Sequence, residues 1–521
     1  MSNEEKHVKS TDELKKMIEN LPLGADNYTR VECAKTFIKE HLSPHKKNDA
    51  ETIINILLQE HFMFKATITN SLIRYYRECH SEHLGKGMSN NSSCILPMWY
   101  KPGENGLKFM PFVLADHIAQ SENIIYVNDT YYRYQHGVYS VTTNLKIQGL
   151  IQDKMLKSES SIYQITDTER QLQLLIQHEV DEINQNPYLI NLKNGFYDVK
   201  NEVFLPHDPK ILSTIQINAN YSTSFCPRFL RFLAEITDGD VEQITLLQEI
   251  LGYCLIPITN AQKCFILHGK AASGKSVFLN VLQEILLGHQ NVSNVSLQNL
   301  GDRFKTAELH GKLANIFADL PDSALSDTGI FKSLTGEDHL HSEKKHKDPF
   351  NFKSKARLLF SCNQLPLIHG DNSEGVFRRL LIIPFNHSIP EGQKDPHLLD
   401  KLHEEADGIL MFALHGLRRL ISNNFVFSET EANRNELNKY RKSSNSSRSF
   451  VHDCCEFDVN SRTEITELYD TYKLYCETYN YRIDTKSYFI DQILSCSETV
   501  SRGVDTKGQK RVLRGIRFKD N

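Results

Sequence analysis

The residues best suited to chemistry lie in one glycine-rich stretch, Gly269-Lys-Ala-Ala-Ser-Gly-Lys-Ser276. Apolar residues 265–267 precede this stretch and an apolar-periodic segment, 277–282, follows it, which predicts a strand, a loop and a helix in that order. Such a loop turns successive N–H groups into one concavity, and the start of the helix adds partial positive charge there. The stretch therefore predicts a nucleoside triphosphate site whose binding residues are Gly269, Ala272, Ser273, Gly274, Lys275 and Ser276.

ATP and Mg²⁺ are the cofactors that this loop implies. Lys275 would reach the β- and γ-phosphates, and the Ser276 hydroxyl would be a ligand of Mg²⁺. A second Mg²⁺ ligand is expected from Asp319, at the end of the buried strand predicted over 312–319, where a carboxylate can hold the ion and help to polarise the attacking water. Asp322 is close enough to contribute, or it caps the next turn instead.

Two further motifs carry groups that can act on a triphosphate. Asn363 ends another apolar strand, 356–363, where its amide would sense the γ-phosphate and orient water; the alternative is an Asn in the turn before Pro366. Arg378 and Arg379 come just before a third apolar strand, and an arginine there can neutralise charge on a phosphoryl group held by a neighbouring subunit. We therefore predict Lys275, Asp319, Asn363, Arg378 and Arg379 as the catalytic set.

A short basic run lies between these motifs, at what looks like the tip of a hairpin. Its members, Lys344, Lys345, His346 and Lys347, are candidate DNA-binding residues, although a lysine run is more often a solvated face.

The composition neither demands nor excludes nucleic acid. The chain has 521 residues and a formal net charge of -5, so DNA binding must come from local basic patches, and the length indicates several domains. The eleven cysteines lack regular spacing, which is typical of reduced thiols in a cytosol. No apolar run approaches a membrane span, and the tyrosine-rich strands over 126–139 are better explained by packing than by base stacking. An intact primase is not expected, because residues 1–180 hold no Asp-x-Asp pair for two metal ions.

The C-terminal part has its own pattern. A short linker is predicted over 442–449, followed by two or three helices and a basic two-stranded ribbon over 500–518, in which Asp505 is the only acid. This layout is that of a winged-helix domain, with Lys510, Arg511 and Arg514 as candidate DNA contacts. A basic tail that only keeps the chain soluble is the alternative.

The order of these motifs resembles the superfamily 3 helicases, specifically the phage/plasmid primase–helicase C-terminal family. The resemblance is carried by the glycine loop, Asp319, Gly336-Glu337-Asp338 with the basic tip, Asn363, and Arg378-Arg379. In detail it is most similar to the replication initiator helicases of staphylococcal pathogenicity islands. Asp319 departs from the family pattern, since many relatives carry Glu or two adjacent acids there, which leaves open which carboxylate is the base.

The resemblance implies a multidomain α/β protein with a mixed α+β N-terminal region, a P-loop AAA+-like ATPase core on a parallel sheet, and the C-terminal winged-helix domain. The expected domains are residues 1–115, 116–255, 256–428 and 450–521. It further implies a ring, normally a hexamer, that moves 3′ to 5′ on DNA in the cytoplasm of a bacterial host, with single-stranded and origin DNA and a primase or phage-encoded protein as partners. An initiator that forms a ring on the origin without unwinding is the alternative, and a small-molecule kinase would have no use for the basic tip or the tail.

Overall fold

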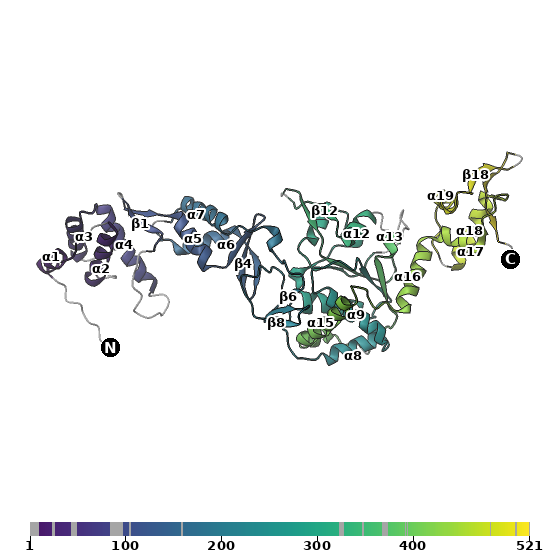
Figure 1. Ribbon diagram of the computed structural model, residues 1–521, viewed down its shortest axis with the longest axis horizontal. Helices are drawn as coiled ribbons and strands as arrows, with labels where there is room; N and C mark the ends of the chain where they lie inside the picture. The colour runs from purple at the N-terminus through teal and green to yellow at the C-terminus, as the bar shows by residue number, and fades with distance from the viewer. Residues whose placement is uncertain are drawn as a thin grey trace. The chain divides into compact units, whose positions relative to one another are not determined.

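The computed structural model describes residues 10–22, 27–42, 49–83, 97–103, 106–157, 160–321, 328–345, 348–366, 374–390, 392, 394–479, 481–505 and 508–519. Asp322, His346 and Lys347 lie outside these ranges. The chain divides into two compact units, Met1–Ile183 and Asn184–Asn521, each of which has its own cores (Figure 1).

The first unit holds two separate hydrophobic cores. One joins the four N-terminal helices, and the other joins two hairpins and the three helices around them. The elements are α1 (Thr11–Glu19), α2 (Asn27–His41), α3 (Asp49–Phe62), α4 (Ala66–His83), β1 (Tyr100–Gly103), β2 (Gly106–Phe109), α5 (Pro111–Ser121), β3 (Ile124–Val127), β4 (Thr130–Gln135), β5 (Val138–Thr142), α6 (Asn144–Lys154), α7 (Ile162–Leu175) and η1 (Val180–Glu182). Tyr131 and Tyr139 of the predicted aromatic strands are buried, as expected for packing rather than for base stacking.

A five-stranded sheet organises the second unit. Its strands are β9 (Cys264–Gly269), β10 (Val292–Ser293), β11 (Ala314–Phe317), β14 (Arg357–Cys362) and β15 (Leu380–Phe385). Their order is β10-β11-β14-β9-β15, and every pairing is parallel, which confirms the predicted parallel sheet. Because strands in such a sheet share one direction, the loops after β9, β11 and β14 all leave from the same edge.

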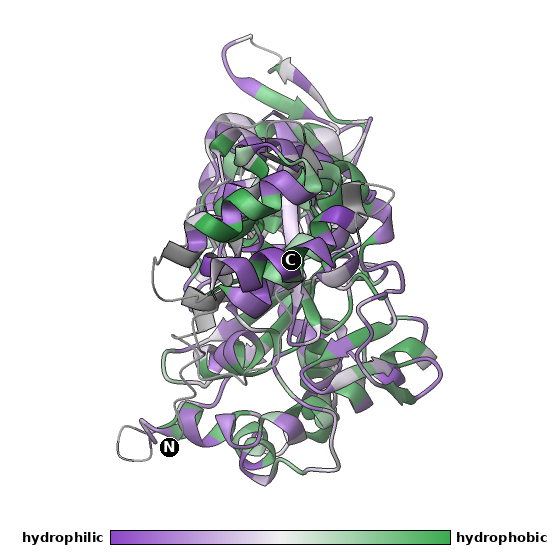
Figure 2. Ribbon diagram, turned by 90° about the vertical axis from the view of Figure 1, so that its left-hand side faces the viewer, coloured by the Kyte–Doolittle hydropathy of each residue, from purple (hydrophilic) through white to green (hydrophobic). Residues whose placement is uncertain are grey.

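Both faces of the sheet are buried, which explains why its strands are almost entirely apolar. Alternate residues of β9 serve the two faces, since Phe265 and Leu267 belong to one core and Cys264 and Ile266 to the other. Figure 2 shows helices whose ribbons alternate between hydrophobic and hydrophilic residues, the pattern of helices with one packed side.

The hydrophobic core that contains Phe265 and Leu267 of β9 also includes residues of the segment before the sheet. That segment contains β6 (Leu189–Leu192), β7 (Gly195–Asp198), β8 (Val203–Leu205), α8 (Pro227–Ile236) and α9 (Val241–Tyr253). Helix α9 begins at Asp240, whose carboxylate accepts hydrogen bonds from two backbone N–H groups of the first turn. It packs closely on α15 (Ala406–Ser422). The approach at Gly252 leaves no room for a side chain, since a Cβ atom there would stand 2.4 Å from the carbonyl oxygen of Ala413.

The remaining elements of this part surround the sheet. They are α10 (Lys275–Asn280), which runs on into the π-helical η2 (Val281–Leu287), then η3 (His289–Asn291), η4 (Leu297–Asn299), α11 (Arg303–Thr306), η5 (Ala307–Leu309), α12 (Thr328–Thr335), β12 (His339–Ser342), β13 (Phe350–Lys353), α13 (Glu374–Phe377), α14 (Leu398–His403) and α16 (Glu431–Ser444). Strands β12 and β13 pair as an antiparallel hairpin.

The C-terminal segment forms its own core from helices and short antiparallel strands. The elements are α17 (Ser446–Cys454), β16 (Cys455–Glu456), β17 (Arg462–Glu464), α18 (Ile465–Tyr479), α19 (Lys486–Cys496), β18 (Ser501–Val504), β19 (Arg511–Arg514) and β20 (Arg517–Phe518). The linker predicted over 442–449 is wrong, because its described residues belong to α16 and α17 apart from Asn445, whose side chain caps α17. Across the described ranges, no helix has both the length and the apolar character needed to cross a membrane.

Candidate nucleotide site

The glycine-rich loop lies where the sheet topology predicts a ligand site, between the carboxyl end of β9 and the start of α10. Gly274 has a φ of 87°, and a side chain there would stand 2.5 Å from Cγ2 of Ile236. At Gly269 a side chain would stand 2.1 Å from the carbonyl oxygen of Phe385 on β15. Both glycines are therefore required by their close packing against β15 and α8.

We expect Gly269→Ala to lower the free energy of unfolding by about 1–3 kcal/mol, because backbone of a buried strand cannot yield to the new methyl group as a side chain could. Thermal unfolding of the full chain measures this loss. Gly149→Ala is the matched control, since no atom lies within 4 Å of the methyl group it would add. Equal melting temperatures for the two variants would contradict the close approach of Gly269 to β15.

Lys275 is folded inward over the loop that precedes it. Its ammonium donates to the carbonyl oxygens of Gly269 (2.7 Å) and Lys270 (2.6 Å), and the residue is only 7% exposed. Burial lowers the pKa of Lys275, and the neighbouring Cys362 and Asp319 oppose that change. The ammonium thus stands in the concavity and has a negative group near it.

Asn363 meets Lys275, although 88 residues separate them along the chain. The side-chain oxygen of Asn363 accepts a hydrogen bond from Nζ of Lys275 at 3.2 Å. The contact arises because β14 pairs directly with β9, so the residue after β14 reaches the glycine loop. This position suits a group that senses the phosphate bound by Lys275.

Asp319 comes two residues after β11 and is exposed at the same edge of the sheet. Its backbone N–H donates to Oγ of Ser361 at 3.3 Å, and its φ of 63° turns the chain away from the strand. Burial raises the pKa of the Cys362 thiol to about 12, with Lys275 lowering it and Asp319 raising it, which shows that Asp319 lies in the electrostatic field of the loop.

These residues fit a magnesium–nucleotide complex. Close packing against β15 and α8 excludes a side chain at Gly269 and Gly274, Lys275 supplies a cation, and Ser276 is exposed in the first turn of α10. Ser276 and Asp319 would hold the ion, because hydroxyl and carboxylate oxygens are the ligands that Mg²⁺ prefers.

The two adjacent arginines differ in their surroundings. Arg379 is 9% exposed, and its Nη1 donates to the carbonyl oxygen of Gly375 at 2.6 Å. Burial and the charge of Arg378 lower the pKa of Arg379, while Asp338 raises it. Arg378 is exposed. Only Arg378 is therefore placed to reach outward from this chain.

The basic tip follows β12, and two of its four residues, Lys344 and Lys345, are described and exposed. Lys344 lies over the ring of Phe350, with Nζ 5.5 Å from the centroid. The loop end of the hairpin is held by Ser342, which donates to the carbonyl oxygen of Arg303 at 2.7 Å, and by His310, whose ring packs edge-on against Phe350 and Phe352. The hairpin therefore presents its lysines from a fixed end.

Sequence patterns missed the contacts of α16 with this region. Tyr440 of α16 donates to the carbonyl oxygen of Pro366, and Arg441 pairs with Glu374 at 3.1 Å and lies over the ring of Phe377. The helix thus contacts both the segment after Asn363 and the helix before Arg378. The single signal in the sequence was an apolar pair, Leu437 and Tyr440, in an otherwise charged helix.

The basic ribbon of the C-terminal segment is more neutral than its sequence indicates. Lys510 pairs with Glu464 at 2.7 Å, Arg502 with Asp491 at 2.5 Å, and Arg517 with Glu456, so acids outside residues 500–518 add to the one acid of the ribbon, Asp505. Arg511 and Arg514 are exposed and have no ion pair among the described residues. They are the ribbon cations left for an external anion.

Comparisons with known proteins cover the middle of the chain. Residues 113–238 match the sequence model of the family described as D5 N terminal like, and residues 267–379 match a family of unknown function designated DUF5906. The second match runs from β9 to Arg379 and so includes the glycine loop, Asp319 and Asn363.

Individual proteins are also similar to parts of this chain. "Putative helicase L207/L206" of Acanthamoeba polyphaga mimivirus is 26% identical over 241 residues, which are 43% of this chain and 25% of that protein. The chain thus spans about a quarter of that relative. Two solved apo structures of the NrS-1 C-terminal region, each 11% identical, cover 78% of this chain and 99% of their own, with TM-scores of 0.48 and 0.45. The sequence matches support the resemblance at the level of phage-type primase–helicase proteins.

Proposed function

We propose that the protein is an ATP-dependent DNA helicase and replication initiator of a mobile element. The observation that carries this proposal is the meeting of Lys275 with Asn363, beside Asp319, at the carboxyl edge of the parallel sheet. ATP with Mg²⁺ is the cofactor that these groups fit. Similarity to a protein described as a helicase supports DNA unwinding as the purpose of the ATP turnover.

The chain would work as a ring, normally a hexamer, with nucleotide held between subunits. Lys275, Ser276, Asp319 and Asn363 would act within one subunit, and Arg378 would reach the nucleotide of its neighbour. Exposure of Arg378 and burial of Arg379 support this assignment. The loop after β12, with Lys344 and Lys345, would grip DNA phosphates in the channel and move the ring 3′ to 5′.

The C-terminal segment would recognise the origin as a winged-helix domain. Helix α19 follows α18 and precedes a β-ribbon, which is the chain order of a helix that enters the major groove beside a wing. Arg511 and Arg514 would contact phosphates. The four domains proposed from the sequence, the pathogenicity-island setting, the bacterial cytoplasm and a primase or phage-encoded partner belong to this same proposal.

Strand displacement on a forked duplex tests the proposal. Wild type should separate the strands with ATP and fail with a non-hydrolysable analogue, and Lys345→Ala/Lys347→Ala should remove displacement while leaving basal ATP turnover. Loss of these charges weakens phosphate contact, so DNA should also cease to stimulate turnover.

The matched control is Lys353→Ala/Lys355→Ala, which removes two exposed lysines near the other end of the same hairpin. It should displace strands like wild type. ATP turnover and DNA binding without any displacement would support the ring-forming initiator instead. Displacement that survives loss of Lys345 and Lys347 would show that the tip is not the DNA grip.

A further inference from the structure

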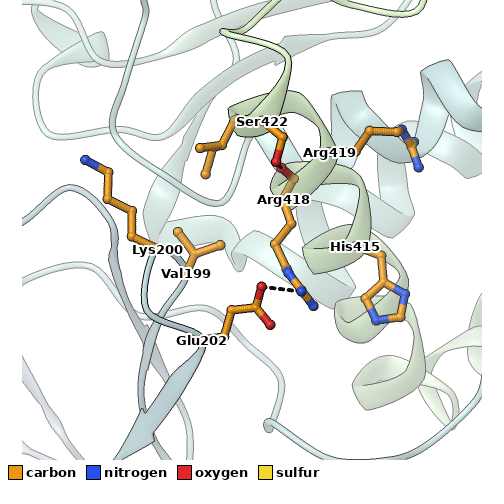
Figure 3. A pocket seen from close by; sticks show the side chains of 8 residues that line it. Val199, Lys200, Glu202, His415, Arg418, Arg419 and Ser422 are labelled. Carbon is orange, nitrogen blue, oxygen red and sulfur yellow. Dashed lines mark hydrogen bonds and ion pairs between the residues drawn. The ribbon is translucent and has the colours of Figure 1, made fainter.

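A second concave site lies in the unit that contains the sheet, away from the residues assigned to nucleotide. It is a cavity of about 540 Å³ between the turn that joins β7 to β8 and the last turns of α15 (Figure 3). Its lining residues are Val199, Lys200, Glu202, His415, Arg418, Arg419, Ile421 and Ser422. Aliphatic and cationic side chains are thus combined in one hollow.

Both walls of the cavity are rigid. The carboxylate of Asp198 accepts hydrogen bonds from the N–H groups of Lys200 (3.0 Å) and Asn201 (3.1 Å), which fixes the turn. On the other wall, α15 cannot slide along α9, because a side chain at Gly416 would stand 2.3 Å from the carbonyl oxygen of Gln248. A ligand would therefore meet a preformed surface and lose little free energy in ordering it.

The cationic side chains that line the cavity differ in the partners that they already have. Arg419 is held by the buried carboxylate of Glu249 at 2.8 Å, and Figure 3 shows its side chain pointing away from Glu202. Arg418 pairs with Glu202, but both side chains are more than one-third exposed, so this ion pair contributes little and can be exchanged. Lys200 lies over the Tyr188 ring, with its Nζ 3.7 Å from the centroid. Figure 3 shows Lys200 pointing away from Arg418, so Arg418 is the cation that can receive a carboxylate.

An open apolar edge begins beside the cavity. Strand β8 is the outer strand of its sheet, and its three residues, Val203, Phe204 and Leu205, are 45%, 38% and 38% exposed. Within the described ranges, the backbone of these residues bonds only to β7. Unpaired edges of apolar strands attract a further strand, and natural proteins usually protect them with charge or Pro. The turn before β8 contains the charged residues Lys200 and Glu202, but the three residues of β8 itself include no charged residue and no proline.

We propose that this edge and cavity form one docking surface for an extended peptide segment of a partner protein, with aliphatic residues followed or preceded by an acidic residue. The peptide would pair with β8 as a fourth strand, and its carboxylate would bind Arg418. Glu202 directly precedes Val203, so a strand on this edge enters the cavity within one or two residues, about 3–7 Å.

Charge and chemistry favour a peptide over nucleic acid. A phosphate backbone would leave the exposed apolar side chains of Val203 and Leu205 uncovered. A strand with aliphatic side chains covers those residues, and backbone hydrogen bonding satisfies the open edge at the same time. Peptide docking at this surface does not require ATP turnover. A negative result for docking therefore leaves the helicase proposal untouched, and a negative result for the helicase leaves the docking proposal untouched.

Display of a library of random twelve-residue peptides on the immobilised full chain tests the docking surface. The expected result is enrichment of peptides that combine alternating aliphatic residues with an acidic residue. The best enriched peptide, labelled and titrated by fluorescence anisotropy, should bind Arg418→Glu at least about ten-fold more weakly, because reversal of one charge removes a charge-assisted hydrogen bond.

Val203→Asp should weaken binding of the same peptide to a similar extent, since this substitution places a charge on the strand edge. Arg231→Glu, a reversal at an exposed arginine of α8 outside the cavity lining, should bind the peptide like wild type. ATP turnover should be unchanged in all three variants. Three outcomes would each overturn the proposal. The library could enrich basic peptides, or no enriched peptide could be sensitive to Arg418→Glu. A single-stranded oligonucleotide could also bind in place of peptide in an Arg418-dependent way.

Discussion

Replacement of Lys275 by alanine is expected to lower ATP turnover by at least about 100- to 1,000-fold, the usual cost of losing one preorganised group that stabilises transition-state charge. The ammonium donates hydrogen bonds both to the glycine loop and to Asn363. Under the proposed nucleotide assignment, removal of this cation would leave the γ-phosphate without the positive charge of Lys275.

The fold should survive this substitution. The groups that Lys275 contacts are two loop carbonyl oxygens, the Ser273 hydroxyl and the Asn363 amide, all at the edge of the sheet, where water can replace the ammonium. Circular dichroism and the melting temperature should therefore match those of wild type. Lys305→Ala, which removes an exposed lysine of α11, is the control for turnover. Turnover that stays within a few-fold of wild type in Lys275→Ala would remove the basis of the nucleotide assignment.

Local sequence predicted the central strand and the residues after it because their requirements are local. The glycine loop demands small residues and a following helix, and an apolar run of four to six residues demands a strand buried on both faces. The same logic gave β15 after Arg379 and the hairpin that carries Lys344. Each of these predictions depended on residues within about ten positions along the chain.

The order of the strands in the sheet is set by contacts between residues much further apart in the sequence than ten positions, and the site depends on that order. Asn363 reaches Lys275 only because β14 is inserted between β9 and β11, and no periodicity within β14 encodes its neighbours. Identical apolar patterns in β9, β14 and β15 would permit other orders. The prediction that Asn363 senses the γ-phosphate came from its place at the tip of an apolar strand, and the pairing of β14 with β9 brings its side chain to Lys275.

Charge is the property that sequence predicted least well. The ribbon cations Lys510 and Arg517 are neutralised by Glu464 and Glu456, acids that lie 46 and 61 positions away in sequence. Likewise, nothing in the dipeptide Arg378-Arg379 distinguishes its members. They separate only when β15 begins at the next residue and turns one side chain inward, against Gly375, and leaves the other outside.

That difference predicts opposite results for the two arginines. Arg378→Ala should leave the melting temperature unchanged and lower ATP turnover of the assembled protein by about 1,000-fold or more, the range found for arginines that act across an interface. Arg379→Ala should instead lower the free energy of unfolding by about 1–3 kcal/mol, because the buried Arg379 side chain is lost and the partly buried carbonyl oxygen of Gly375 loses its donor. Thermal unfolding and steady-state turnover, measured on both variants, separate the two roles.

Mixing of subunits tests whether Arg378 acts on a neighbour. Lys275→Ala and Arg378→Ala should each be inactive alone, yet an equal mixture should recover activity, because an interface between an intact loop and an intact arginine is complete. In a ring assembled at random, about one interface in four has that composition, so recovery should approach a quarter of wild-type turnover. Re-assembly of the mixture must be verified by sedimentation, with each variant alone as the control. A mixture that assembles but stays inactive would place Arg378 outside the catalytic site, whereas recovery with Arg379→Ala in place of Arg378→Ala would assign the role to the buried arginine.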